Sequence, residues 1–174
     1  AVESLVGHGS AALELLVRAD EAARHTGAAG MRTAVALDAA RIELDSGRTR
    51  RAAARLAAVG EEADLSHADA VDLRGMRGRL SAAEGRPFEA VVHADRAVAA
   101  SLLTDSPLVQ ATAELDRART LSTLGRWADA RASAHTAREH YDSKGHLPGV
   151  RAAAGCVPDG PAPDGTALIT RERS

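Results

Sequence analysis

The amino-acid sequence predicts an all-α fold of stacked antiparallel helical hairpins, with about seven helices in all. Alanine, which has the highest helix propensity, accounts for 40 of the 174 residues. Runs of β-branched and aromatic residues, which are typical of strands, are nearly missing from the sequence. A pattern of small residues also recurs around glycines along the chain, and this repetition predicts an array of similar units.

The first expected helix covers residues 10–26 and carries a partial copy of the recurring pattern that starts at Gly7. The next two expected helices cover residues 31–46 and 49–63. We place a turn at Gly47 between them, because glycine readily adopts the left-handed conformation that ends a helix. These two helices therefore form the first complete hairpin of the predicted array.

The second expected hairpin joins residues 66–84 to residues 87–103 through a turn at Gly85. Its first helix begins at Ser66, which forms a capping-box pattern with Asp69 in the acidic position. An N-cap side chain accepts a hydrogen bond from the free backbone N–H groups at the start of a helix. The pattern therefore places a helix start at this point of the chain.

The third expected hairpin joins residues 107–124 to residues 127–143 through a turn at Gly125. Ser106 followed by Pro107 is typical of an N-cap and first helical position, since proline lacks the N–H that a first turn leaves unpaired.

Small residues keep a constant spacing from the three turn glycines, which are themselves 38 and 40 residues apart. They stand seven residues before, five after and twelve after each glycine: Ala40, Gly78 and Ala118; Ala52, Ala90 and Ala130; and Val59, Ala97 and Ala137. Two helices joined by a tight turn must approach closely, and small side chains permit that approach. Because one hairpin cannot bury its own apolar face, successive copies are expected to stack.

These residues resemble the tetratricopeptide-repeat family over about residues 5–155. The resemblance implies a right-handed α-solenoid, with a repeat domain at residues 1–154 followed by a linker and tail at 155–174. The sequence departs from the family pattern in its longer period and in its lack of aromatic knobs, so another α-solenoid stays an alternative.

The C-terminal part of the sequence resembles a second group of known proteins. Residues 155–165, "GCVPDGPAPDG", are typical of a linker. The following "TALITRERS" resembles the opening of the LuxR-type helix-turn-helix domain at residues 169–172, and "AREHYDSKGHLPGVRAAAG" resembles the last repeat of MalT-like members. The resemblance implies a signal-sensing part of a cytoplasmic bacterial transcriptional regulator, with a small-molecule inducer as one kind of ligand. A stand-alone adaptor that bridges two proteins, a small-ligand receptor and an ordinary tail are the alternatives.

Arginine recurs six residues before each turn glycine, as Arg41, Arg79 and Arg119. Stacking would line these side chains along one face, where planar guanidinium groups suit carboxylate or phosphate. We therefore predict a concave groove for a protein or peptide of acidic character. The alternative is pairing within each helix, because Asp38 and Asp116 stand three residues before Arg41 and Arg119.

Composition and motifs argue against several other functions. The net charge of −2 gives no general attraction to nucleic acid or to anionic membranes. The sequence lacks the spacing of zinc ligands, a nucleophile motif and a phosphate-binding glycine loop, so we expect a non-enzymatic module without metal or cofactor. Trp127 and Phe88 each follow a turn, and both are expected to pack against the adjacent hairpin.

Overall fold

The structure is a computed structural model that describes residues 11, 14–19, 21–22, 25, 29–59 and 64–157. Within these residues the chain forms helices and turns, and contains no strand. The all-α prediction is therefore confirmed for this part of the chain. Residues 14–19 are helical and belong to the expected first helix, and seven complete helices follow them.

The seven helices agree closely with the expected ones up to residue 143. They are α2 (Ala29–Asp45), α3 (Thr49–Ala57), α4 (His67–Ala83), α5 (Pro87–Ser101), α6 (Pro107–Thr123), α7 (Trp127–Ser143) and α8 (Leu147–Gly155). The largest difference among the expected helices is in α3, which ends at Ala57 although the sequence predicted a helix to residue 63.

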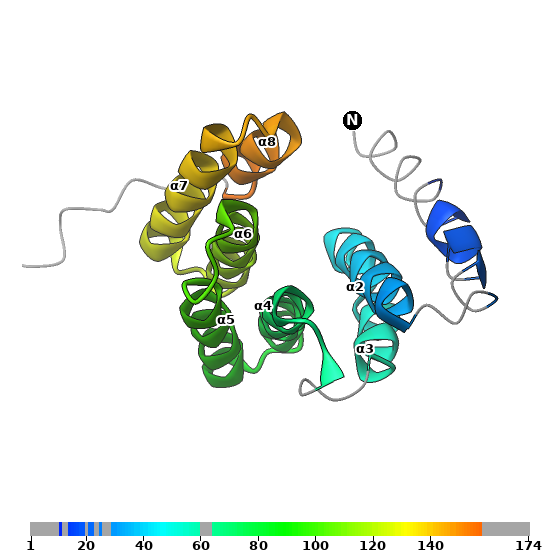
Figure 1. The fold of residues 1–174 in the computed structure, drawn as a ribbon. Coiled ribbons are helices and arrows are strands. Elements are labelled where there is room, and N and C mark those ends of the chain that lie inside the picture. The colour runs from blue at the N-terminus through cyan, green and yellow to red at the C-terminus, as the bar shows by residue number, and fades with distance from the viewer. Residues whose placement is uncertain are drawn as a thin grey trace, which may run out of the picture.

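The helices form three hairpins and a final single helix. The hairpins are α2–α3, α4–α5 and α6–α7, and each hairpin packs against the next. Figure 1 shows an arc with α2, α4, α6 and α8 on its inner side and α3, α5 and α7 on its outer side. Neighbouring inner helices contact one another, whereas α2 and α6 make no direct backbone packing contact because α4 lies between them. The handedness of the stack stays a prediction.

The small residues of the repeat lie at the contacts between helices. Eight of the nine are buried, and the ninth, Val59, is half-buried. The buried ones are Ala40, Gly78, Ala118, Ala52, Ala90, Ala130, Ala97 and Ala137. A Cβ atom at Gly78 would lie 3.1 Å from the backbone oxygen of Ala90 and 3.1 Å from the backbone nitrogen of Ala94. The hairpin helices thus approach so closely that only small side chains fit between them.

The turns and helix starts follow the signals in the sequence. Gly47, Gly85 and Gly125 have φ angles of 70°, 75° and 73°, in the left-handed region that glycine favours. The side chain of Ser66 accepts a hydrogen bond from the backbone N–H of Asp69 at 3.2 Å, and Ser106 caps α6 in the same way.

Helix α8 was not among the expected helices, and it packs on α7 through a space left by Gly149. A Cβ atom at Gly149 would lie 2.5 Å from two ring atoms of Tyr141. The same ring stacks on His146 with 5.1 Å between ring centroids, and the Nδ1 atom of His146 accepts a hydrogen bond from the N–H of Gly149. This helix is hard to predict from the sequence because Gly149, near its start, has a low helix propensity.

Two further expectations concern the outer face and the tail. Phe88 is 81% exposed, so the prediction that it packs against the adjacent hairpin is wrong, while Trp127 is half-buried. Ala90, two residues later on α5, is fully buried instead. Residues 158–174, which hold most of the expected linker and the whole "TALITRERS" stretch, lie outside the described residues.

Among the described helices, none has the length and apolar character needed to cross a membrane.

Candidate functional site: a charge cluster on the inner face

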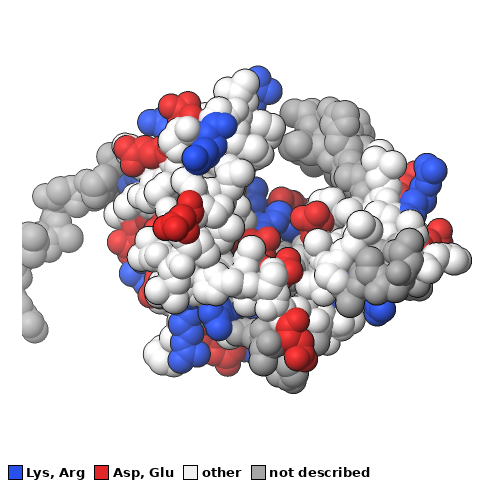
Figure 2. All heavy atoms as spheres, in the orientation of Figure 1, with Lys and Arg blue, Asp and Glu red and all other residues white. Residues whose placement is uncertain are grey.

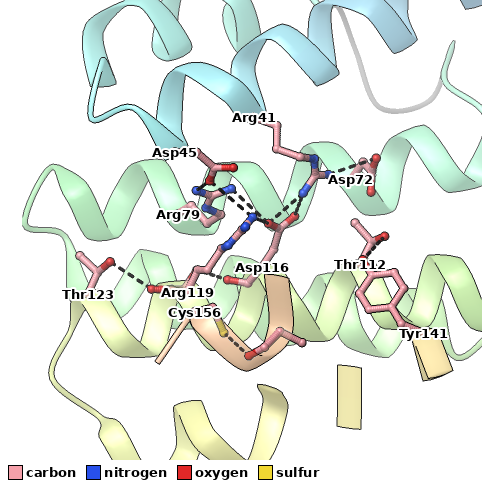
Figure 3. Close-up of polar contacts among 12 residues, drawn as sticks. Arg41, Asp45, Asp72, Arg79, Thr112, Asp116, Arg119, Thr123, Tyr141 and Cys156 are labelled. Atoms are coloured by element: carbon pink, nitrogen blue, oxygen red, sulfur yellow. Dashed lines mark hydrogen bonds and ion pairs between the residues drawn. The ribbon is translucent and has the colours of Figure 1, made fainter. Parts of the chain in front are cut away.

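Three arginines from three successive inner helices converge on one carboxylate, that of Asp116 on α6. The Nη1 atom of Arg41 on α2 donates to both carboxylate oxygens of Asp116, at 2.9 and 2.8 Å. Arg79 on α4 lies 3.3 Å from Oδ1, and Arg119, one turn further along α6, lies 3.9 Å from the same atom. Figure 3 shows the three guanidinium groups pointing toward Asp116 from different helices.

Asp116 reaches Arg41 by passing over helix α4 at Gly75. The Asp116 side chain is only 1% exposed. A Cβ atom at Gly75 would lie 3.0 Å from the Oδ2 atom and 3.2 Å from the Cβ atom of Asp116. The missing side chain at Gly75 therefore leaves the space through which α6 and α2 are connected, although these two helices do not otherwise pack together.

Two more carboxylates complete the cluster nearer the surface. Asp72 on α4 pairs with the Nη2 atom of Arg41 at 3.3 Å. Asp45, the last residue of α2, pairs with Arg79 and lies 3.4 Å from the Nη1 atom of Arg119. The cluster therefore contains three arginines and three aspartates, and its formal charges balance.

The surroundings shift the pKa values of two aspartates in opposite directions. Burial by itself raises the pKa of Asp116, but Arg41, Arg79 and Arg119 together outweigh burial and hold that pKa below its ordinary value. Burial raises the pKa of Asp72 to about 6, because Arg41 only partly offsets the loss of water and Asp116 adds repulsion. Asp116 is thus a fixed negative charge at neutral pH, whereas Asp72 is the member of the cluster that titrates most readily.

The three arginines predicted from the repeat, Arg41, Arg79 and Arg119, do lie on one inner face, and they are bound together by aspartates. Pairing within a helix occurs for Arg119 and Asp116, whereas both partners of Arg41 lie on other helices. Partner binding by these arginines stays a prediction.

Sequence reasoning missed four residues that build the cluster: Asp45, Asp72, Gly75 and the central role of Asp116. For Asp45, the signal in the sequence is a departure from the repeat, whereas Asp116 has a counterpart, Asp38, at the same distance from the first turn glycine. The equivalents of Asp45 in the next two repeats are Ala83 and Thr123, both of which are uncharged. A charge that appears in only one copy of a repeat was therefore the available clue.

A groove of about 570 Å³ lies beside the cluster, between the last turns of α2, α4 and α6 and helix α8. Its polar lining includes Asp45, Arg79, Arg119, Arg151, Thr49 and Thr123. Figure 2 shows acidic and basic side chains gathered in the hollow between the two halves of the arc. Arg151 on α8 is exposed and makes no ion pair with other residues in the described part of the chain.

The groove can attract a negatively charged group. It lies at helix C-termini, whose carbonyl ends carry partial negative charge, and Arg79 and Arg119 offset that charge. Because Asp45 and Asp116 neutralise these two arginines, the positive excess of the groove comes from Arg151, which makes no ion pair with another described residue. Guanidinium and hydroxyl donors together suit carboxylate or phosphate oxygens.

No family model, curated protein or solved structure matches this chain.

Proposed function

We propose that this chain is a non-enzymatic binding module that holds an acidic segment of a partner protein in the groove on its inner face. One observation carries the proposal: Arg79, Arg119 and Arg151, from three different helices, surround the same groove. Helical repeat arrays commonly present extended concave surfaces of this kind to their partners. The volume of about 570 Å³ has room for a few side chains of a bound segment.

Arg151 is the residue that tests this proposal most cleanly. Arg79 is only 9% exposed and holds two aspartates, so its replacement would disturb the fold as well as the groove. Arg151 is exposed, and it makes no ion pair among the described residues that its replacement would break. We expect Arg151→Glu to weaken binding of an acidic peptide by about tenfold, which corresponds to about 1.4 kcal/mol.

The experiment is a fluorescence-anisotropy titration of a labelled hexaglutamate peptide with the wild-type chain and two variants. Arg126→Glu is the matched control, because it makes the same charge change at the α6–α7 turn, away from the groove. Equal weakening by both variants would show that only the overall charge matters, and the groove would then have no special role. No binding by the wild-type chain would also reject the proposal.

We further propose that the array is the sensing part of a LuxR-type bacterial transcriptional regulator and that it is related to tetratricopeptide repeats. The support comes from the "TALITRERS" stretch after a proline- and glycine-rich linker and from the spacing of small residues in the repeats. In such a protein, a bound segment or a small-molecule inducer would change the exposure of the attached DNA-binding domain. The test is whether the parent coding sequence continues in frame into a helix-turn-helix domain after Ser174.

A further inference from the structure

Asp45 and Asp116 both contact Arg79 and Arg119, but the two aspartates differ sharply in their exposure to solvent. Asp116 is 1% exposed, and contacts Arg41, Arg79 and Arg119 from within the stack. Asp45 is 42% exposed, and contacts Arg79 and Arg119 from the groove side. One carboxylate is therefore fixed behind the arginines, and the other lines the groove beside Arg79 and Arg119.

Among the described residues, the ion-pair partners of Asp45 are Arg79 and Arg119. It is the last residue of α2, where the carbonyl ends of the helix disfavour a negative charge. The turn at Gly47 follows two residues later, and the Asp45 side chain lines the groove. Asp45 is 42% exposed and its partners Arg79 and Arg119 are 9% and 21% exposed, so water reaches the carboxylate rather than the arginines, and Asp45 is the more exchangeable of the two aspartates.

We infer that Asp45 is an internal competitor that occupies the place of a ligand carboxylate in the free protein. This inference rests on the proposed function, because it concerns regulation of the same groove. An acidic side chain of the bound segment displaces Asp45 from Arg119 and Arg79, while Asp116 keeps both arginines oriented. Arg151 on the opposite wall binds a second carboxylate of the same segment. The groove therefore selects closely spaced acidic residues, and Asp45 lowers its affinity for them.

Asp45→Asn tests the inference, because asparagine keeps the shape of the side chain and removes the competing charge. We expect this variant to bind the labelled hexaglutamate peptide about three- to fivefold more tightly than the wild-type chain, the gain expected when an exposed ion pair no longer competes. The matched control is Asp129→Asn. Asp129 is also exposed and paired with an arginine, Arg126, but at the α6–α7 turn outside the groove. Both variants change the net charge equally.

The outcomes separate this inference from the proposed function. If the wild-type chain binds the peptide and Arg151→Glu weakens that binding, but the two asparagine variants bind alike, then Asp45 is not a competitor and the binding function stands. If the wild-type chain and both asparagine variants fail to bind, the proposed function fails with the inference. Asp45→Ala provides an independent measurement at the same site, and must also bind more tightly than the wild-type chain.

Free glutamate distinguishes a protein segment from a small carboxylate ligand. We expect free glutamate, at the same total carboxylate concentration as the peptide, to compete poorly, because its α-ammonium group offsets one of its two carboxylates, whereas the peptide carries several acids on one tether. Competition as strong as that of unlabelled hexaglutamate would overturn the choice of a protein segment as the ligand.

Discussion

Arginine–aspartate ion pairs occur both on the inner face of this array and at its hairpin turns, but in different surroundings. Asp116 on the inner face is 1% exposed and is bound by arginines from three helices. Asp129, in the first turn of α7, is 50% exposed, and among the described residues its ion-pair partner is Arg126, three residues earlier. The comparison shows that an arginine–aspartate pair can connect several helices when it is buried between them, whereas the pair at the turn connects neighbouring residues of one segment.

Asp116→Asn should have the largest effect, because it leaves the charges of Arg41 and Arg79 buried without their main partner. Breaking a buried ion pair by removing one member typically costs about 3–5 kcal/mol. We expect a loss of that size in the free energy of unfolding, measured by urea denaturation. A loss similar to that of Asp129→Asn would show that the two settings are energetically equivalent.

Gly75→Ala should have the next largest effect, because the new Cβ atom would press on the carboxylate of Asp116. Alanine gains about 1 kcal/mol of helix propensity over glycine, and overpacking against a fixed neighbour costs about 1–3 kcal/mol. We expect a net loss of about 1 kcal/mol in urea denaturation. In the Asp116→Ala background the loss should be smaller, because the contact with the carboxylate is removed while the contact with the Cβ atom remains. A stabilising effect in the wild-type chain would contradict the account.

The pH dependence of stability should reveal Asp72. Its pKa is raised to about 6 in the folded chain, above the ordinary value of 3.8, so the folded state holds the proton more tightly than the unfolded state. This contribution favours folding below about pH 4 and is lost as the pH rises through about 6. Relative to Asp72→Asn, the wild-type chain should therefore lose stability between pH 4 and pH 7. A difference between the two urea midpoints that is constant with pH would refute the assignment.

Arg126→Gln should have the smallest effect. Its pair with Asp129 is exposed to solvent and connects residues only three apart, and such pairs contribute about 0–1 kcal/mol. We expect a change in the free energy of unfolding below about 0.5 kcal/mol. A cost above 2 kcal/mol would remove the contrast between the turns and the inner face.

The sequence predicts the hairpins well because each hairpin is specified locally. Gly85, Gly78 and Ala90 lie within a short stretch, and together they determine where the chain turns and where two helices meet. Helix α8 escaped prediction because it is short and carries Gly149, a poor helix former, in its first turn. Its stability comes instead from packing against Tyr141.

The candidate site was predictable only in part. The arginines stand at constant positions in the repeat, so the spacing alone places Arg41, Arg79 and Arg119 on one face. The pairing of Arg41 with Asp116 joins residues 75 positions apart. It depends on how far each hairpin is rotated relative to the next and on the open space at Gly75. Neither quantity is encoded in a local pattern.

A double-mutant cycle between Arg41 and Asp116 tests the central claim most directly, namely that one buried pair connects α2 to α6 across α4. Arg41→Met, Asp116→Asn and the combined variant would be compared with the wild-type chain by urea denaturation. Contacting residues in such cycles show interaction energies of about 0.5–3 kcal/mol, and we predict about 2 kcal/mol or more for this buried pair. A coupling below about 0.5 kcal/mol, the level of distant independent sites, would contradict the account.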